Sequence, residues 1–325
     1  MDISKSLTYF RNLIDVNGIL QFSKLYEKDY DSGYAIEDQA RALVLTLKLN
    51  DRDLINHFSN LIRLSWTKGK GVDTLRLKDG TYSGVFDGYR EASAEVLWAL
   101  GELEKSYPGK RVELQDMFSD LAEGLLRTNY TRVVGYSILG LCGWGEKNKA
   151  KEFGEKLVDY FEKYLTADWP WFEEEMTYAN ALLPWALFTL YSLTKESKFL
   201  NVGEKSLNFL LTNLSKDNIP LVVGTRGWWK RGGMMALYDQ QPIDVSYLVL
   251  ASISAYKVTK NEFYLKKARF YYSWFEGNNL KKVRMIRDDG ACFDGLWEDR
   301  LNRNGGAESI ICYLLASLEL KNLLK

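Results

Sequence analysis

Histidine is the scarcest chemically active residue in this chain of 325 residues, because His57 is its single histidine. One imidazole excludes zinc sites built on several histidines, and it excludes any mechanism that needs two imidazoles. A Ser-His-Asp arrangement would have to use His57 itself. His57 lies in the middle of a helical pattern, within Asp53–Phe58, so we expect a surface or packing role for it.

Cysteine is also rare, with Cys142, Cys292 and Cys312 as the three examples. Their number is odd, and no two of them have the spacing of a metal site or a redox motif. A disulfide framework is therefore not expected, and a reducing, cytoplasmic location is predicted. The first five residues lack the basic-then-apolar order of a signal peptide.

An excess of charge of either sign is absent, since Lys and Arg total 43 and Asp and Glu total 43. Nucleic-acid-binding proteins usually carry a basic footprint, so no nucleic-acid partner is expected. The most apolar stretch, Ala181–Leu193, is too short to span a bilayer and contains Pro184. No phosphate-loop signature is present, and the acids near the C-terminus are spaced too loosely for an EF-hand. The sequence thus predicts no cofactor, no metal and no membrane span.

Helical patterns dominate what is present, and strand signals are scarce. The expected helices alternate between segments that are apolar nearly all round and segments with one charged face. The first kind is typical of a buried helix and the second of an outer helix. The expected ranges are Ala40–Leu49, Ala92–Glu104, Leu114–Leu126, Tyr136–Cys142, Lys149–Tyr164, Ala181–Leu193, Lys198–Leu214, Val245–Val258, Glu262–Phe275 and Ala307–Leu320.

Each apolar helix is preceded by a polar or aromatic loop that ends near an acid or an amide. Six such helix starts occur, at Glu37–Gln39, Arg90–Glu91, Val134–Tyr136, Glu175–Asn180, Gln240–Asp244 and Asn304–Glu308. Markers in successive starts lie 53, 44, 42, 65 and 64 residues apart. A period of this length with two helices per unit is typical of an array of helical hairpins. We therefore predict an all-α fold, an (α/α)6 toroid of six hairpins forming a single domain over residues 1–325.

Polar chemistry is expected where the inner helices of such a ring begin, on one face. Acids there also cap the unpaired N–H groups of a helix, which is the plainer explanation for any one of them. The densest group is Trp169–Asn180, in which Glu173, Glu174 and Glu175 are consecutive. Like charges repel, so a buried member of this run would titrate high. Aromatic faces beside carboxylates suit sugar rings, although a core tryptophan pair with solvated glutamates fits the same pattern.

Two further loops carry polar and aromatic residues. Gly224–Gly233 is basic, aromatic and flanked by glycine, which fits a lid over a cleft or, equally, a long surface loop. Asp288–Ser309 is rich in acids and amides and leads into the last apolar helix.

Several of these segments together resemble the six-hairpin, glycosidase-like superfamily of (α/α)6 toroids. The matching stretches are Gly33–Leu43, then Trp171–Glu173 with Thr177, Tyr178 and Asn180, then Asp239–Asp244, and finally Asp294–Leu296 with Asn302, Asn304 and Gly306–Ser309. More narrowly, the chain is similar to helical toroid domains found alone or behind bacterial and archaeal glycosyltransferases, among glycan-processing genes. The resemblance implies a toroid that acts on sugars or binds them.

The resemblance also shows departures. Related sequences often have Asp at the position of Ala179 and tend to have Arg at the position of Glu95. If either family residue is catalytic, this chain lacks it. Sugar epimerases of the same toroid type use paired histidines, so the presence of His57 alone makes that activity unexpected.

Two functional hypotheses follow. The first is a cytoplasmic glycoside hydrolase that cleaves an oligosaccharide or glycan with two carboxylates, one acting as general acid. The second is a non-catalytic sugar-binding or assembly module that works with a glycosyltransferase. A terpene cyclase of similar shape would need an apolar cavity, which this polar pattern does not favour. The catalytic candidates are Glu173, Glu175, Asp38, Asp244 and Asp294, and the substrate-binding candidates are Trp171, Tyr178, Asn180, Arg41, Asp239, Gln240, Gln241, Asn304, Glu308 and Trp228.

Overall fold

The computed structural model describes residues 2–323, which form twelve α-helices, two short 3-10 helices and seven antiparallel pairs of two-residue strands. The chain divides into two compact units. One unit is Arg11–Glu155, and the other combines Met1–Phe10 with Lys156–Lys325. Long regular elements are thus almost entirely helical, as the scarcity of strand signals predicts.

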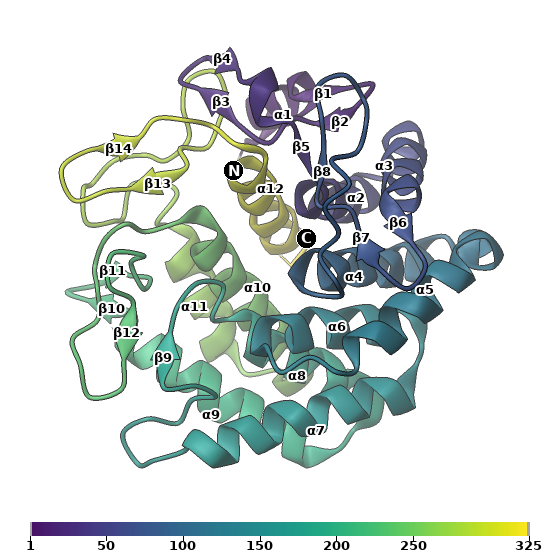
Figure 1. Cartoon of the computed structure of the whole chain (residues 1–325). Helices are drawn as coiled ribbons and strands as arrows, with labels where there is room; N and C mark the ends of the chain where they lie inside the picture. The colour runs from purple at the N-terminus through teal and green to yellow at the C-terminus, as the bar shows by residue number, and fades with distance from the viewer. Residues whose placement is uncertain (1, 324–325) are drawn as a thin grey trace. The chain divides into compact units, whose positions relative to one another are not determined.

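The unit Arg11–Glu155 is built from five helices and the start of a sixth (Figure 1). They are α2 (Ile36–Leu49), α3 (Arg52–Ser65), α4 (Glu91–Ser106), α5 (Arg111–Leu125), α6 (Thr131–Trp144) and α7 (Lys147–Tyr164). Helices α2, α4 and α6 are buried over most of their length, whereas α3 and α5 are buried on one side. The alternation of apolar and amphipathic segments therefore predicts correctly which helices are internal.

Glycines allow α4 and α6 to approach until their backbones touch. A Cβ atom at Gly101 would lie 2.2 Å from the carbonyl oxygen of Gly140, and one at Gly140 would lie 2.4 Å from the carbonyl oxygen of Leu97. Gly143 is equally close to Gly101, with 2.5 Å between its Cβ position and the carbonyl carbon. Any side chain at these positions would push the two helices apart, so the glycines fix the spacing of this pair.

Short strands and two short 3-10 helices connect the helices of this unit. The strands are β1 (Ile14–Asp15), β2 (Gly18–Ile19), β3 (Ser23–Lys24), β4 (Glu27–Lys28), β5 (Tyr34–Ala35), β6 (Trp66–Thr67), β7 (Gly71–Val72) and β8 (Leu75–Arg76), and the 3-10 helices are η1 (Tyr30–Ser32) and η2 (Pro108–Lys110). The pair β5–β8 holds the start of α2 against the long loop that precedes α4, with Tyr34 opposite Arg76.

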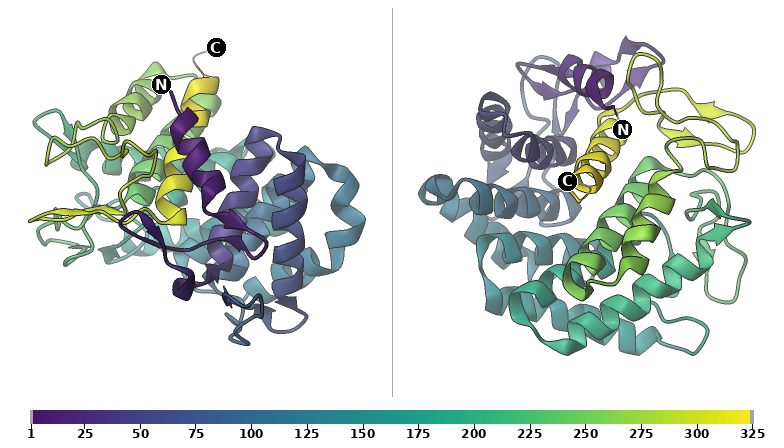
Figure 2. Two further views of the ribbon diagram at one scale, coloured as in Figure 1. Left: turned by 90° about the horizontal axis from the view of Figure 1, so that it is seen from above. Right: turned by 180° about the vertical axis from the view of Figure 1, so that it is seen from behind.

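The second unit contains α1 (Ser4–Asn12, of which the first residues belong here), α8 (Leu182–Thr194), α9 (Ser197–Asn213), α10 (Pro242–Thr259), α11 (Glu262–Tyr272) and α12 (Ala307–Asn322). Its strands are β9 (Glu175–Met176), β10 (Ser215–Lys216), β11 (Ile219–Pro220), β12 (Trp229–Lys230), β13 (Gly295–Leu296) and β14 (Leu301–Asn302). Helix α10 packs against α8, α11 and α12, and the view from behind in Figure 2 shows α10, α11 and α12 together.

Local signals mark several helix boundaries. Asp51 accepts a hydrogen bond from the backbone N–H of Leu54 at the start of α3, and Asn261 accepts one from Phe263 at the start of α11. Proline stands at the first position of α10, where its missing N–H has no consequence. These boundaries are set by residues within a few positions of the helix end, which is why the sequence predicts them well.

Each of the ten expected helices has a counterpart, but several boundaries are misplaced, most of all the starts of α2 and α6. Helix α2 begins at Ile36, four residues before the predicted Ala40. Helix α6 begins at Thr131, five residues before the predicted Tyr136, so Val134–Tyr136 lies inside the helix and is not a helix start. Tyr130 precedes the helix without a side-chain cap, and Gly135 suggests a loop, so local signals mislead here. Helix α1 has no counterpart among the expected helices, and α3 was expected only as the helical pattern around His57. That residues 1–325 form one domain stays a prediction.

Candidate functional site

In the second unit, Asp294 lies at the start of α12. Its Oδ1 accepts a hydrogen bond of 2.7 Å from the backbone N–H of Gly306, the residue directly before the helix. The backbone N–H of Asp294 in turn donates to the carbonyl oxygens of Asn302 (3.2 Å) and Asn304 (3.1 Å). These bonds fold the loop back on itself, so Asp294, Asn304 and the first turn of α12 form one local structure, as their common cluster in the sequence suggests.

The pKa of Asp294 is raised from its ordinary value of 3.8 to about 6. Burial is the main cause, because it disfavours the charged carboxylate, and the negative charge of Glu308 adds to the effect. Hydrogen bonds from Gly306 and Ser309 and the charge of Arg287 act in the opposite direction but are weaker. Asp294 can therefore hold a proton close to neutral pH, which most exposed carboxyl groups cannot.

Asp239 and Gln240 lie beside this loop. Gln240 and Leu296 exchange two backbone hydrogen bonds, of 3.0 and 2.9 Å, which place Gln240 two residues along the strand from Asp294. Within residues 2–323, the buried Nε2 of Gln240 has no acceptor, while its Oε1 accepts from the indole N–H of Trp274 at 2.8 Å. Because that indole can only donate, the orientation of the amide is fixed.

Asp239 has a similar unused atom. Its Oδ2 pairs with Arg226 at 3.3 Å, whereas its Oδ1 is buried and has no donor among the described residues. A buried polar atom without a partner costs free energy, so such atoms often mark a place where a ligand or water binds. One unused acceptor and one unused donor on consecutive residues match the hydroxyl groups of a polyol.

Asp244 joins two predicted segments. It lies in the first turn of α10, and its Oδ1 accepts a hydrogen bond of 2.7 Å from the backbone N–H of Ala179. Asn180, also buried, donates to the carbonyl oxygen of Thr177 at 2.8 Å. Gln241 precedes α10 without capping it through its side chain. The structure therefore brings the fourth and fifth predicted helix starts together through a buried carboxylate.

The run Glu173–Glu175 is not buried. Glu174 is exposed and pairs with Arg231 at 3.2 Å, and Glu175 lies 4.0 Å from Lys230. These ion pairs accompany the strand pairing of β9 with β12, which ties the basic loop after Gly224 to this segment. The expected burial of one member of this run is therefore not found, and Glu173 and Glu175 are partly exposed.

The aromatic candidates differ in their exposure. Trp171 has a side chain that is 0% exposed, with its ring at 5.1 Å from that of Phe172, so its faces are covered by protein. Tyr178 and Trp228 are both partly exposed, and their ring centroids lie 6.4 Å apart. The pair Tyr178–Trp228, rather than Trp171, therefore offers aromatic surface to a ligand.

In the unit Arg11–Glu155, Asp38 belongs to a buried ion-pair network. Arg41 pairs with Asp38 at 3.1 Å and with Glu95 of α4 at 2.6 Å, and all three side chains are almost inaccessible. An arginine at position 95, as in the related sequences, would repel Arg41. Glu95 instead attracts Arg41, so the residue that departs from the family pattern forms an ion pair that links α2 to α4.

Glu37 is a polar residue of this unit that the sequence names as part of a helix start but not as a site candidate. It lies in the first turn of α2 and is partly exposed. Burial raises its pKa, and the negative charges of Glu91 and Asp87 raise it further, against an opposing effect of Arg41. The sequence alone does not indicate which of the polar residues Glu37–Gln39 is open to a ligand, because only the fold shows that Asp38 is paired with Arg41.

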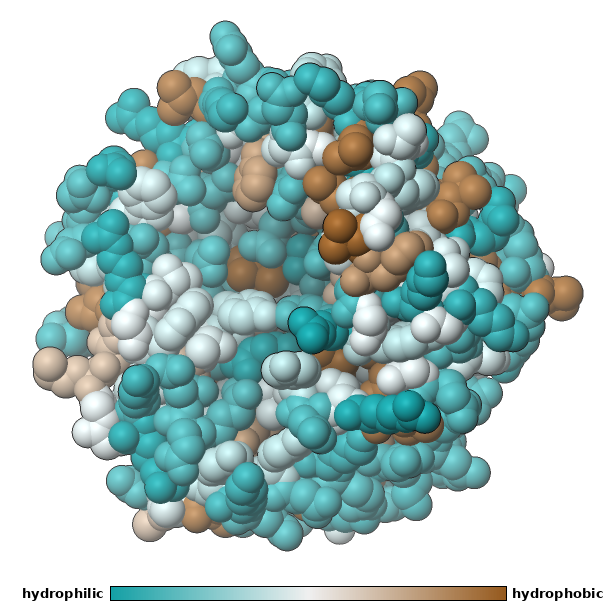
Figure 3. Space-filling model, viewed as in Figure 1, coloured by the Kyte–Doolittle hydropathy of each residue, from teal (hydrophilic) through white to brown (hydrophobic). Residues whose placement is uncertain are grey.

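His57 lies in the middle of α3 as its pattern predicts, and burial lowers its pKa. Among residues 2–323, no group of three or more His, Cys, Asp and Glu side chains is arranged to hold a metal ion. None of the helices described is both long enough and apolar enough to cross a membrane. The face shown in Figure 3 is largely hydrophilic, with small scattered hydrophobic groups.

No protein-family model matches this chain, and no curated protein matches it in sequence. Solved structures, however, match it over nearly its whole length. Cellobiose 2-epimerase from Bacillus thermoamylovorans is 12% identical with a TM-score of 0.76, covering 98% of this chain and 95% of its own. A D-mannose isomerase is 14% identical with a TM-score of 0.73, covering 99% and 96%. A family 76 glycoside hydrolase from a bovine Bacteroides thetaiotaomicron strain is 11% identical with a TM-score of 0.69, covering 98% and 77%.

The chain has the fold of the six-hairpin, glycosidase-like toroids. The predicted fold class, an all-α (α/α)6 toroid, is confirmed by this likeness. Identities of 11 to 14% show the fold alone and do not transfer a reaction. Toroids of this fold include hydrolases, epimerases and isomerases among the similar structures, so the reaction has to be argued from the residues described above.

Proposed function

We propose that this protein is a carbohydrate-processing enzyme and, specifically, a glycoside hydrolase whose general acid is Asp294. The observation that carries the proposal is the pKa of Asp294, which burial raises to about 6 at the start of α12. A carboxylic acid that keeps its proton near neutral pH can donate it to a glycosidic oxygen. The fold of sugar-acting enzymes and the unused polar atoms of Asp239 and Gln240 support a sugar substrate.

In the proposed reaction, Asp294 gives its proton to the leaving oxygen while the bond from that oxygen to the anomeric carbon breaks. Water adds to the anomeric carbon, and a second carboxylate takes the proton that the water loses. We assign this base to Glu308, because its negative charge acts on Asp294 and the N-terminal turn of α12 favours a carboxylate. Asp244 is another catalytic candidate of this unit, besides the partly exposed Glu173 and Glu175, and we assign it a positioning role because of its bond to Ala179.

Substrate contacts follow from the same geometry. The buried Oδ1 of Asp239 can accept a hydrogen bond from a sugar hydroxyl, and Nε2 of Gln240 can donate one. Gln241, Asn180 and Asn304 are further polar residues of the same helix starts. Tyr178 and Trp228 supply the aromatic surface that we first expected from Trp171.

Hydrolysis is favoured over epimerisation by the histidine content. Epimerases of this toroid type use paired histidines, whereas His57 is the one histidine of this chain and lies within α3. We therefore assign the acid and base roles to carboxylates. The prediction of a reducing, cytoplasmic location rests on the three cysteines and is kept as part of this proposal.

The test is release of reducing ends from a broad panel of oligosaccharides by the purified protein. Asp294→Asn should lower the rate by about 10²- to 10⁴-fold, the usual contribution of a general acid, with folding intact by circular dichroism. The wild-type rate should fall as the pH rises through about 6, because Asp294 then loses its proton. Asp299→Asn, an exposed aspartate of the next loop that pairs with Arg300, is the matched control and should keep full activity.

Glu308→Gln tests the role of general base separately from the role of general acid. It should also lower the rate and should shift the upper limb of the pH profile to lower pH, since removal of its charge lowers the pKa of Asp294. Full activity of Asp294→Asn on a substrate that the wild type cleaves would refute the proposed mechanism.

A second candidate function is a sugar-binding or assembly module that works with a glycosyltransferase and cleaves nothing. The pairing of Asp38 with Arg41 and Glu95 favours it, since this predicted catalytic acid is bound in a structural network. In that case the protein binds glycans on an array without releasing reducing ends, and Asp38→Asn and Asp294→Asn leave binding unchanged.

A further inference from the structure

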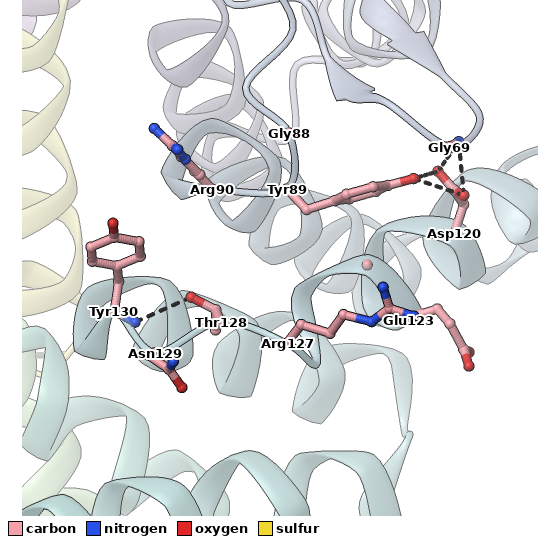
Figure 4. Close-up of a pocket in the computed structure, with 11 residues that line it drawn as sticks. Gly69, Gly88, Tyr89, Arg90, Asp120, Glu123, Arg127, Thr128, Asn129 and Tyr130 are labelled. Carbon is pink, nitrogen blue, oxygen red and sulfur yellow. Dashed lines mark hydrogen bonds between the residues drawn. The ribbon is translucent and has the colours of Figure 1, made fainter.

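A cavity of about 600 Å³ lies in the unit Arg11–Glu155, and none of the residues that line it was assigned a role above. Its walls are the loop before α4, the end of α5 and the loop before α6 (Figure 4). The volume lies within the range of small-molecule sites in proteins, roughly 300 to 1,000 Å³. The cavity therefore has room for one or two sugar rings.

Tyr89 forms a fixed wall of this cavity. Its hydroxyl donates to the carboxylate of Asp120, at 3.0 and 3.1 Å from the two oxygens. One side of its ring rests directly on Gly124, where a Cβ atom would lie 2.3 Å from the ring. Figure 4 shows the ring extended along the cavity with Asp120 at its hydroxyl end. The ring is thus held in place before any ligand binds.

Tyr130 supplies an open aromatic surface at the other end. Its side chain is 63% exposed, and the backbone N–H of the same residue donates to Thr128 at 3.2 Å, which holds the turn before α6. Figure 4 shows Tyr130 on the same side of the cavity as Arg90. An exposed ring on a held turn is suited to stack on the face of a ligand ring.

The cavity is lined by two acids and two arginines, and the two acids already have partners. Asp120 accepts further hydrogen bonds from the indole of Trp66 (2.8 Å) and the backbone of Gly69 (3.2 Å). Glu123 lies 3.5 Å from the ammonium group of Lys149. Both carboxylates are therefore already engaged.

The two arginines of the cavity, in contrast, have no charged partner. Within residues 2–323, neither Arg90 nor Arg127 has an ion pair, and both are exposed at the cavity. In Figure 4, Arg127 extends below Tyr89, and Arg90 projects at the other end. Guanidinium groups bind carboxylates, sulfates and phosphates through paired hydrogen bonds. Two free guanidinium groups beside two tyrosine rings define a preference for a ring that carries a negative charge.

We propose that this cavity binds an acidic oligosaccharide whose rings carry anionic substituents such as uronate carboxylates. One ring stacks on Tyr130 against the wall made by Tyr89, and the anionic groups are held by Arg127 at one end and by Arg90 at the other. None of the residues that line the cavity has a role in the proposed hydrolase, and the proposal does not depend on cleavage of any sugar.

Isothermal titration calorimetry of the full-length protein tests the proposal, with trigalacturonate as the acidic probe and maltotriose as its neutral match. Trigalacturonate should bind at one site per chain, and its affinity should fall as salt is added. Arg127→Gln and Arg90→Gln should each weaken binding at least about tenfold, since each removes a charge-assisted hydrogen bond. Tyr130→Ala should weaken it less, and its exposure makes loss of folding unexpected.

Arg52→Gln is the matched control, because Arg52 is an exposed arginine of the same unit outside the cavity. It should leave the affinity for trigalacturonate unchanged. Sodium sulfate should compete only weakly. The proposal is overturned if trigalacturonate does not bind, if the arginine variants bind it as the wild type does, or if maltotriose or bare sulfate binds equally well.

Discussion

Asp38 and Asp294 lie at comparable places, each near the first turn of a buried helix, but different groups face them. Asp38 of α2 is buried against the guanidinium of Arg41, which also holds Glu95 of α4. Asp294 faces the backbone N–H of Gly306 and has the acid Glu308 nearby, and its pKa is raised to about 6. The first carboxylate has an ion pair with a buried guanidinium, whereas the second has hydrogen bonds from Gly306 and Ser309 and only a weak effect of the charge of Arg287.

This difference shows that the position of an acid at a helix start does not decide its role. A buried carboxylate with a matched arginine supports packing, because its charge is compensated within the protein. A buried carboxylate without one is driven toward its protonated form and becomes able to transfer a proton. Substitutions that remove the buried charges should therefore affect carboxylates with a matched arginine and carboxylates without one differently.

The largest effect is expected from Arg41→Met. It leaves Asp38 and Glu95 buried without their shared counter-charge, which should lower the free energy of unfolding by about 3–5 kcal/mol. Urea denaturation followed by circular dichroism measures it. The triple variant Asp38→Asn/Arg41→Met/Glu95→Gln, in which no charge remains, should recover most of the loss. If the triple variant is as unstable as the single one, shape rather than charge holds α2 against α4.

A smaller effect of opposite sign is expected from Asp294→Asn. In the wild type the folded state binds the Asp294 proton more tightly than the unfolded state, so stability falls as the pH rises from about 4 to about 6. The asparagine variant has no such cost. It should therefore be about 3 kcal/mol more stable than the wild type at pH 7.5 and nearly equal to it at pH 4. A difference that does not change between these pH values would contradict the assigned pKa.

The smallest effect is expected from Glu174→Gln. Its ion pair with Arg231 is largely exposed to solvent, with 58% of the glutamate side chain accessible. Pairs of this kind contribute about 0–1 kcal/mol, and salt reduces them further. Thermal unfolding at low and high salt should show little change. A loss above about 1.5 kcal/mol would mean that the β9–β12 pairing depends on this charge more than surface pairs usually do.

The sequence predicts the fold well because its signals are local and repeated. Apolar helices such as α10 are apolar all round, and Pro242 marks where this one begins. The start of α6 is mistaken because Tyr130 gives no capping signal and Gly135 lies within the helix. The role of Gly140 cannot be predicted at all from neighbours in sequence, since it depends on Leu97 and Gly101 in another helix.

The site is predicted in part. The loop around Asp294 and Asn304 is local, so its residues are identified together. Pairings across long separations are not, and Arg41 with Glu95 is one of them. Trp171 shows a second limit, since an aromatic side chain beside carboxylates has the same pattern whether it is buried or open. Arg127 and Tyr130 are missed because they belong to the misplaced start of α6.

The glycine contact between α4 and α6 has a consequence for the order in which the molecule opens. Where two backbones touch, solvent cannot reach the amide groups between them until the helices separate. Amide hydrogens of Leu97–Gly101 and Gly140–Gly143 should therefore exchange with deuterium last in their unit, at the rate of its global unfolding. The loops that carry Tyr89 and Tyr130 join the ends of this slow pair, so the cavity walls are anchored to the most persistent part of that unit.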